Sequence, residues 1–334
     1  MATKTERVLA RVQGQVDKIM AAAESLEAGQ ARFLVDNYYA VQDVRIACAA
    51  QERSTEASVP ILAYTGKLMA MVEDGIRDLL HEYAKGHRAG RWALSICGIG
   101  PVITAGLLAH IDITRCQTAG AVWRFAGLDP SKKWIGRDGA KALVKETLAR
   151  ASGKVSVEDV AALALRTDNR LETVLAWMTP PAQTEPKLDA EHLAAALARR
   201  PWNARLKVLC AFKIGESFVK TQNSADDTYG KVYAQRKAEE VARNEAGGNA
   251  ELAARILTEK SYRGETTAKK MLESGKLPQA QIHARARRYA VKLFLAHYFE
   301  VAYECYHGQK PPKPYILTQP GHVHFVSVPC WPVP

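Results

Sequence analysis

The sequence LSICGIGPVITAGLLAHI, residues 94–111, decides the fold predicted for this part of the chain. Gly98 and Gly100 flank one apolar residue, and Pro101 follows where an apolar helix would begin. Proline suits the first turn of a helix because its missing N–H needs no acceptor there. Glycine lets the backbone bend tightly and approach another molecule closely. The pattern therefore predicts a helix, a Gly-Ile-Gly hairpin and a second helix.

The predicted hairpin has the properties of a phosphate-binding site. Its backbone N–H groups, and those in the first turn of the second helix, would point outward at the positive end of the helix dipole. This arrangement resembles the helix-hairpin-helix motif, which grips nucleic-acid backbone without reading sequence. The candidate nucleic-acid-binding residues are Gly98, Ile99, Gly100, Val102, Ile103 and Thr104.

One feature leaves a second interpretation open. Many such motifs carry a lysine after the proline, where this chain has Val102. The alternative is a helix pair whose glycines only permit close packing. If the hairpin does bind phosphate, a β-carbon at Gly98 or Gly100 is expected to clash with the tight turn or with the approaching phosphate.

The next segment extends the pattern into a family resemblance. It reads Trp123-Arg124-Phe125-Ala126-Gly127-Leu128-Asp129-Pro130 and follows a short turn at residues 112–116. Together, Gly-Ile-Gly-Pro-Val, a Leu-Leu-Ala helix and an Ala-Gly-Leu-x-Pro end are similar to the C-terminal domain of insertion-sequence transposases. That family includes the bridge-RNA-guided recombinases and the Piv DNA invertase. The resemblance covers about 40 residues, and a weaker continuation runs from Pro201 to Lys220.

The resemblance implies a nuclease domain that this sequence does not reproduce. In the family, an RNase H-like domain with four acidic metal-binding residues precedes the C-terminal domain. Here residues 1–90 show helical periodicity instead of a strand that bears an aspartate. Asp36 and Asp43 are expected to be solvated charges on a helix. We interpret the nuclease domain as lost or replaced.

The resemblance also implies a nucleophilic serine, which would fall at Ile135 in this sequence. Ser131, beside Lys132 and Lys133, is the one local substitute and the candidate catalytic residue. Its alternative role is to cap a turn while the two lysines contact phosphate. Ser217 lies on a helix predicted over residues 206–220, and nothing in the sequence singles it out.

Composition favours a nucleic-acid partner. The 334 residues are 47% hydrophobic, ample for a core, and carry a net charge of +11. An excess of this size favours polyanions, although an unrelated basic protein is the alternative. We expect no signal peptide and no membrane span, and six cysteines without C-x-x-C spacing predict reduced thiols in a cytoplasmic protein.

The hydrophobic periodicity predicts an all-α fold. Helices are expected over about residues 4–30, 30–52 and 60–85, and over 156–165, 170–178 and 189–200 farther on. The predicted segments are an N-terminal helical region (1–90), a helix-hairpin-helix unit (91–136), an inserted helical subdomain (137–200), a basic helical region (201–307) and a proline-rich extended tail (308–334). The inserted subdomain is either a helix-turn-helix reader or a structural insert.

The basic region supplies the remaining candidates. Lysines and arginines recur along predicted helices at 206–220, 229–243 and 283–306. Clustered cations near a phosphate-binding motif favour backbone contacts over a merely solvated face. The candidate cationic contacts are Lys132, Lys133, Arg205, Arg285, Arg287, Arg288 and Lys292. In the tail, His322 and His324 would share one face of a strand, but no acidic partner is near and no metal site is expected.

These patterns predict a protein that binds DNA, or structured RNA, through its backbone and is related to the transposase C-terminal domain. No cofactor is expected, and a homo-oligomer is left open. One alternative is a DNA-strand recombinase that uses Ser131 with a nuclease partner supplied in trans. The other is a helical interaction or structural protein.

Overall fold

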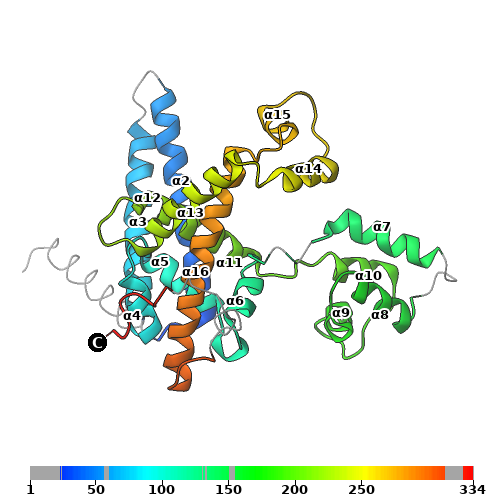
Figure 1. The fold of residues 1–334 in the computed structure, drawn as a ribbon. Coiled ribbons are helices and arrows are strands. Elements are labelled where there is room, and N and C mark those ends of the chain that lie inside the picture. Colours follow the sequence, from blue (N-terminus) through cyan, green and yellow to red (C-terminus); the bar gives the residue numbers. More distant parts are fainter. Residues whose placement is uncertain are drawn as a thin grey trace, which may run out of the picture. The chain divides into compact units, whose positions relative to one another are not determined.

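The computed structural model describes residues 23, 25–55, 60–129, 131, 134–149, 155–312 and 326–333. Every regular element within these ranges is a helix, which confirms the all-α prediction (Figure 1). The chain divides into two compact units, the first formed by Met1–Trp123 with Val208–Pro334 and the second by Arg124–Lys207. None of the described helices combines the length and the apolar character needed to cross a membrane.

Two long helices open the first unit. Helix α2 (Ala28–Ser54) starts with a capping box in which Glu27 and Gln30 exchange bonds with backbone N–H groups, and α3 spans Pro60–Lys85. They lie side by side (Figure 1). Both were predicted, but the helix predicted over residues 4–30 falls mostly outside the described residues, and residues 25–27 are not helical.

Helix α5 (Pro101–His110) packs against this pair and is preceded by the short α4 (Arg88–Leu94). The buried residues of this core are Ala31, Val35, Leu80, Tyr83, Val102, Ala105 and Ala109. On another side, a β-carbon at Gly106 would lie 2.6 Å from Leu209 Cδ2, so α5 approaches the segment at Leu209 closely.

That segment is one continuous helical run of three parts. Helix α11 (Ala204–Val208) leads into a π-helix, η2 (Leu209–Ile214), and then into α12 (Gly215–Thr221). The sequence predicts one regular helix over residues 206–220, whereas the structure has a π-helix within it. Because a π-helix turn takes in more residues than an α-helical turn, it rotates the side chains that follow it, and such segments are frequent at functional sites.

The rest of the first unit is built on α16 (Gln279–His307), which packs along α13 (Thr228–Glu245). The helix starts four residues before the predicted His283, directly after Pro278. Between them the chain forms α14 (Ala250–Glu259) and α15 (Thr267–Glu273), which the sequence analysis did not predict.

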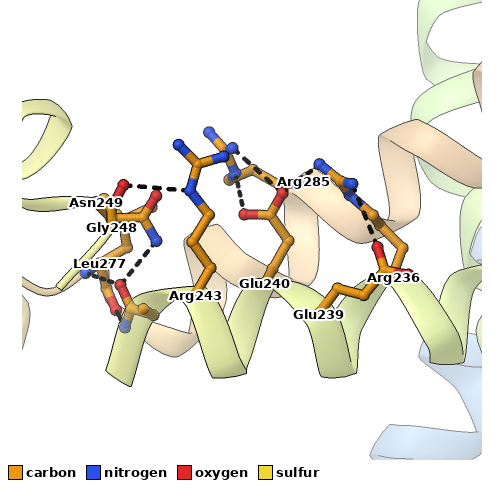
Figure 2. Close-up of polar contacts among 9 residues, drawn as sticks. Arg236, Glu239, Glu240, Arg243, Gly248, Asn249, Leu277 and Arg285 are labelled. Atoms are coloured by element: carbon orange, nitrogen blue, oxygen red, sulfur yellow. Dashed lines mark hydrogen bonds and ion pairs between the residues drawn. The ribbon is translucent and has the colours of Figure 1, made fainter. Parts of the chain in front are cut away.

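Asn244 at the end of α13 fixes the return to α16. Its side-chain oxygen accepts from Leu277 N at 2.8 Å and from Asn249 Nδ2 at 3.0 Å, while its own Nδ2 donates to Leu277 O (Figure 2). Asn244 and Asn249 are both buried. Because buried polar groups are costly when unpaired, this network favours one geometry of the connection.

The second unit has its own helical core. Its helices α7 (Gly136–Leu148), α8 (Val157–Arg166), α9 (Leu171–Met178) and α10 (Ala190–Leu197) bury a cluster that includes Leu163, Val174, Met178 and Leu193. Ser156 and Asp189 are the N-caps of α8 and α10, at the residues where these two helices were predicted to start. This unit spans Arg124–Lys207 and is therefore longer than the insertion predicted at 137–200. The boundary at Arg124 falls near the end of helix α6 (Ala119–Phe125).

Residues 326–333 attach to the first unit through polar contacts. Trp92 Nε1 donates to Pro329 O at 2.8 Å, and His297 Nε2 lies 3.0 Å from Val326 O. On its other side, His297 Nδ1 lies 2.7 Å from the Tyr229 hydroxyl. Burial lowers the pKa of His297 to about 4, against the opposing effect of the Val326 carbonyl. The imidazole is therefore neutral at physiological pH, with Nε2 donating and Nδ1 accepting.

This lowered pKa predicts an acid-labile fold. Between pH 6.5, the ordinary histidine pKa, and pH 4 the unfolded chain binds a proton at His297 that the folded chain excludes. The stability contributed by the neutral His297 should therefore be complete above this window. The free energy of unfolding should fall by about 3 kcal/mol as the pH drops through it. Urea unfolding across this range should show a shallower pH dependence for His297→Gln than for the wild type. Parallel pH profiles would contradict the assignment.

Candidate nucleic-acid interface

The connection between α4 and α5 is short and tightly turned. After α4 ends, Ile99 N donates to Ile96 O at 2.9 Å, and Gly98 adopts a left-handed φ of +84°. Gly100 is the N-cap of α5 with extended φ and ψ of −93° and 179°, and Pro101 occupies the first turn. The predicted positions of both glycines and of the proline are therefore correct.

Several predicted contact residues face inward. The side chains of Ile99, Val102 and Thr104 are buried. Thr104 N donates to Gly100 O at 3.0 Å, which closes the first helical bond of α5. The N–H groups of Val102 and Ile103 precede that bond, at positions where a helix offers no internal acceptor. A ligand contact by Val102 is therefore made by its backbone N–H, whereas the side chain of Ile103 is only half-buried.

The two glycines differ in what surrounds them. A β-carbon on Gly98 would lie 2.8 Å from Ser217 Oγ, whose hydroxyl donates to Gly98 O at 2.5 Å. A β-carbon on Gly100 would have no atom within 4 Å. The clash within the turn is thus confirmed for Gly98, whereas at Gly100 only the expected clash with an approaching phosphate is left as a prediction. Ser217, which the sequence did not single out, holds the hairpin from α12.

An open cleft of about 500 Å³ lies at the N-terminal end of α5. Its walls come from α2, α3, the hairpin, the π-helix and α12. The lining residues are Tyr38, Tyr39, Gln42, Arg77, Gly100, Pro101, Val102, Ile103, Phe212, Lys213, Glu216, Ser217 and Lys220. The cleft thus combines a helix N-terminus, aromatic rings and cations.

The cations of the cleft differ in how they are held. Lys213 Nζ lies 4.0 Å from the centre of the Tyr39 ring, a cation–π contact. Arg77 is paired with Asp74 at 2.9 Å on the exposed surface of α3. Lys220 is exposed on α12. Burial raises the pKa of Tyr39, so its phenol stays protonated.

The acidic residue of the cleft is neutralised from α16. Glu216 forms an ion pair with Arg287, whose side chain is only 14% exposed and whose guanidinium lies 5.5 Å from the centre of the Phe212 ring. Gly215 makes room for it, since a β-carbon there would lie 2.6 Å from Arg287 Cγ. Arg287 was one of the candidate phosphate contacts, but little of its side chain is exposed because it packs against Gly215, Glu216 and Phe212.

The rest of the cationic cluster predicted on α16 is also partly engaged. Arg285 Nε lies 2.8 Å from Glu240 Oε2, and Arg236 Nη2 lies 2.6 Å from Oε1 of the same carboxylate (Figure 2). Burial disfavours the Glu240 charge, but hydrogen bonds and charges of both arginines outweigh it and lower the pKa of Glu240. Arg285 is therefore an ion-pair partner of Glu240, and its guanidinium is only partly accessible to solvent.

The two remaining members of that cluster lie nearer the surface. Arg288 is exposed, beside the exposed Tyr289. Lys292 Nζ lies 4.2 Å from the centre of the Trp123 ring. The predicted dense patch is thus a mixture of paired and accessible cations.

Two other candidates, Ser131 and Arg205, lie in the second unit. Ser131 is exposed, and its hydroxyl and N–H both bond to Asp129 Oδ1, at 2.7 Å and 3.0 Å, which forms a local turn. Ile135 is exposed and directly precedes α7. Arg205 is an exposed residue of α11. Lys132, Lys133, His322 and His324 lie outside the described residues.

A family model covers the hairpin. Residues 90–146 match the model of the transposase IS116/IS110/IS902 family. The match runs from α4 through α5 and α6 into α7, and supports a transposase-like domain in this part of the chain. Searches of curated proteins and of solved structures gave no match.

Most of the cleft lies outside the matched segment, and its position was not predicted from the sequence. Tyr38 and Tyr39 come from α2, and Phe212, Lys213 and Ser217 come from the run after Ala204. The sequence did contain one indication of the cleft, the adjacent tyrosines Tyr38 and Tyr39 in a helix of mixed polar and apolar residues. No sequence signal specifies that α2 and η2 meet beside the hairpin.

The contrast between the two glycines predicts opposite stabilities. Gly98→Ala should lower the free energy of unfolding by about 1–3 kcal/mol, because it places a side chain at positive φ against Ser217. Gly100→Ala should leave it unchanged or raise it by up to about 1 kcal/mol, because its backbone is extended and its surroundings are open. Urea unfolding of both variants tests this, and equal losses would contradict the described hairpin.

Proposed function

We propose that this chain binds nucleic-acid backbone, DNA in the first place, through a helix-hairpin-helix unit of a transposase-related protein. The observation that carries the proposal is the opening of the α5 N-terminus into a cleft with Lys213 and Lys220, directly after Gly98 and Gly100. The family match over residues 90–146 supports a transposase-related role.

The chemistry of the cleft suits a phosphate group. The N–H groups of Val102 and Ile103 lie at the positive end of the α5 dipole. Lys213 and Lys220 add charge that attracts a polyanion. None of these groups requires a particular base, so the contact positions the backbone and carries no sequence information.

The proposal predicts a salt-dependent affinity with a contribution from Lys220. Lys220→Ala should weaken duplex binding and reduce the slope of log affinity against log salt by about 0.9, since one phosphate contact is lost. Lys260→Ala is the matched control, because it removes another exposed lysine of the first unit that does not line the cleft. Electrophoretic titrations on duplex DNA and on structured RNA, across salt, measure both slopes.

The two variants separate the outcomes. A reduced slope for Lys220→Ala with an unchanged slope for Lys260→Ala supports a contact in the cleft. Equal effects would show that only net charge matters, and no binding of the wild type at low salt would reject the proposal.

On catalysis, we propose that the chain alone neither cleaves nor rejoins DNA. The position expected for the family serine is Ile135, and the Ser131 hydroxyl is held by the Asp129 carboxylate. A serine attacks a phosphodiester only when its oxygen is free to approach a phosphorus whose charge is neutralised. Incubation with supercoiled and branched DNA plus Mg²⁺ or Mn²⁺, followed by a denaturing gel, should show no nick and no covalent adduct. An adduct that disappears in Ser131→Ala would establish the recombinase alternative.

A further inference from the structure

The second unit has three tryptophans that each contact a cation. Arg200 lies 4.8 Å from the centre of the Trp134 ring, Arg199 lies 5.7 Å from Trp177, and Lys207 Nζ lies 3.9 Å from Trp202. All three cations come from one short stretch, residues 199–207. We call this stretch together with the three tryptophans the tryptophan–cation segment.

Trp134 is the most accessible of the three rings. It is 42% exposed although its indole N–H donates to Ala198 O at 2.8 Å and Arg200 lies over the ring. Because one edge and one face are engaged, the exposed area belongs to the rest of the ring. The indole is therefore anchored through its N–H while 42% of the residue stays open to solvent.

The segment is also anchored at its other end. Asn203 N donates to the carbonyl of Phe125, itself 39% exposed, at 2.9 Å. Gly127 has a left-handed φ of +64°, and a β-carbon there would lie 2.8 Å from both Trp202 Cγ and Lys207 Cδ. The close approach of Trp202 and Lys207 thus depends on glycine at this position.

Cations dominate the electrostatics of the segment. The sequence contains no aspartate or glutamate between Glu191 and Glu216, and Arg199 and Arg200 are exposed. If the cation–π pairs served only to stabilise the connection after α10, buried rings would be sufficient. They do not account for an oriented ring that stays open to solvent beside exposed arginines.

We infer that the tryptophan–cation segment binds unpaired nucleotides, whose bases stack on Trp134 while their phosphates contact Arg199 and Arg200. Oriented aromatic rings combined with cations recognise single strands in this way, because every unpaired base has an accessible face. A duplex hides those faces. The segment therefore adds a single-strand contact to the backbone contact proposed for the cleft, and it does not depend on that contact.

The test is fluorescence anisotropy of the full chain with labelled single strands of about ten nucleotides. Trp134→Ala should weaken binding to a single-stranded oligothymidine about tenfold or more, as expected for the loss of one stacked base. Binding to a blunt-ended duplex of two separate strands should be unchanged. Trp134→Phe should restore part of the single-strand affinity. Oligouridine in a parallel titration shows whether the strand is RNA or DNA.

Charge variants separate stacking from attraction. Arg200→Ala should lower the single-strand salt slope by about 0.7, whereas Trp134→Ala should leave the slope unchanged. Arg166→Ala is the matched control, since it removes an exposed charge of the same unit that contacts no tryptophan. Circular dichroism melting checks that each variant is folded.

The outcomes are distinguishable from a failure of the cleft. Equal losses on duplex and single strand for Trp134→Ala, or no loss on either, would overturn the inference. If Lys220→Ala has no effect on duplex while Trp134→Ala still weakens single-strand binding, the cleft proposal fails and this inference stands.

Discussion

The aromatic core around Phe294 is the interaction on which the first unit depends. Its ring stacks on Trp92 at 5.8 Å between centroids and meets Phe218 and Tyr229 edge-on at 5.6 Å and 5.2 Å. These rings come from α4, α12, α13 and α16, so one buried cluster joins segments from both sequence halves of the unit. Aromatic pairs add directional energy to the burial of their area. The hairpin after α4 and Ser217 on α12 are consequently brought together by packing behind the cleft.

Helix positions were predictable because they depend on neighbours in sequence. The periodicity of residues 60–85 and the helix starts at residues 156 and 189 are each specified locally, and the structure agrees. The glycine and proline positions of the hairpin were predictable for the same reason. What periodicity cannot supply is the partner of a charged side chain. Arg285 and Arg287 meet Glu240 and Glu216, which lie 45 and 71 residues away in sequence.

The cleft was unpredictable for a related reason. Its lysines were visible as charges, but their meeting with Tyr38 and Tyr39 depends on how α2 and the run from Leu209 pack against α5. Gly106 permits that approach by offering no β-carbon to Leu209. In sequence such a glycine is indistinguishable from one that only loosens a helix. The surroundings of Gly98 and Gly100 show the same limit, since the two residues look alike in the motif and differ only in space.

The bond from Trp92 to Pro329 joins residues separated by 237 positions, and it has a consequence for the order of folding. The first unit is assembled from two stretches of chain that flank Arg124–Lys207, whereas the second unit is one continuous stretch. During synthesis the second unit therefore has all its partners as soon as it leaves the ribosome. Helix α4 has to wait for α16 and then for residues 326–333 before its tryptophan is covered. Contacts this distant in sequence slow folding, because closing a long loop of chain costs conformational entropy before the contact forms.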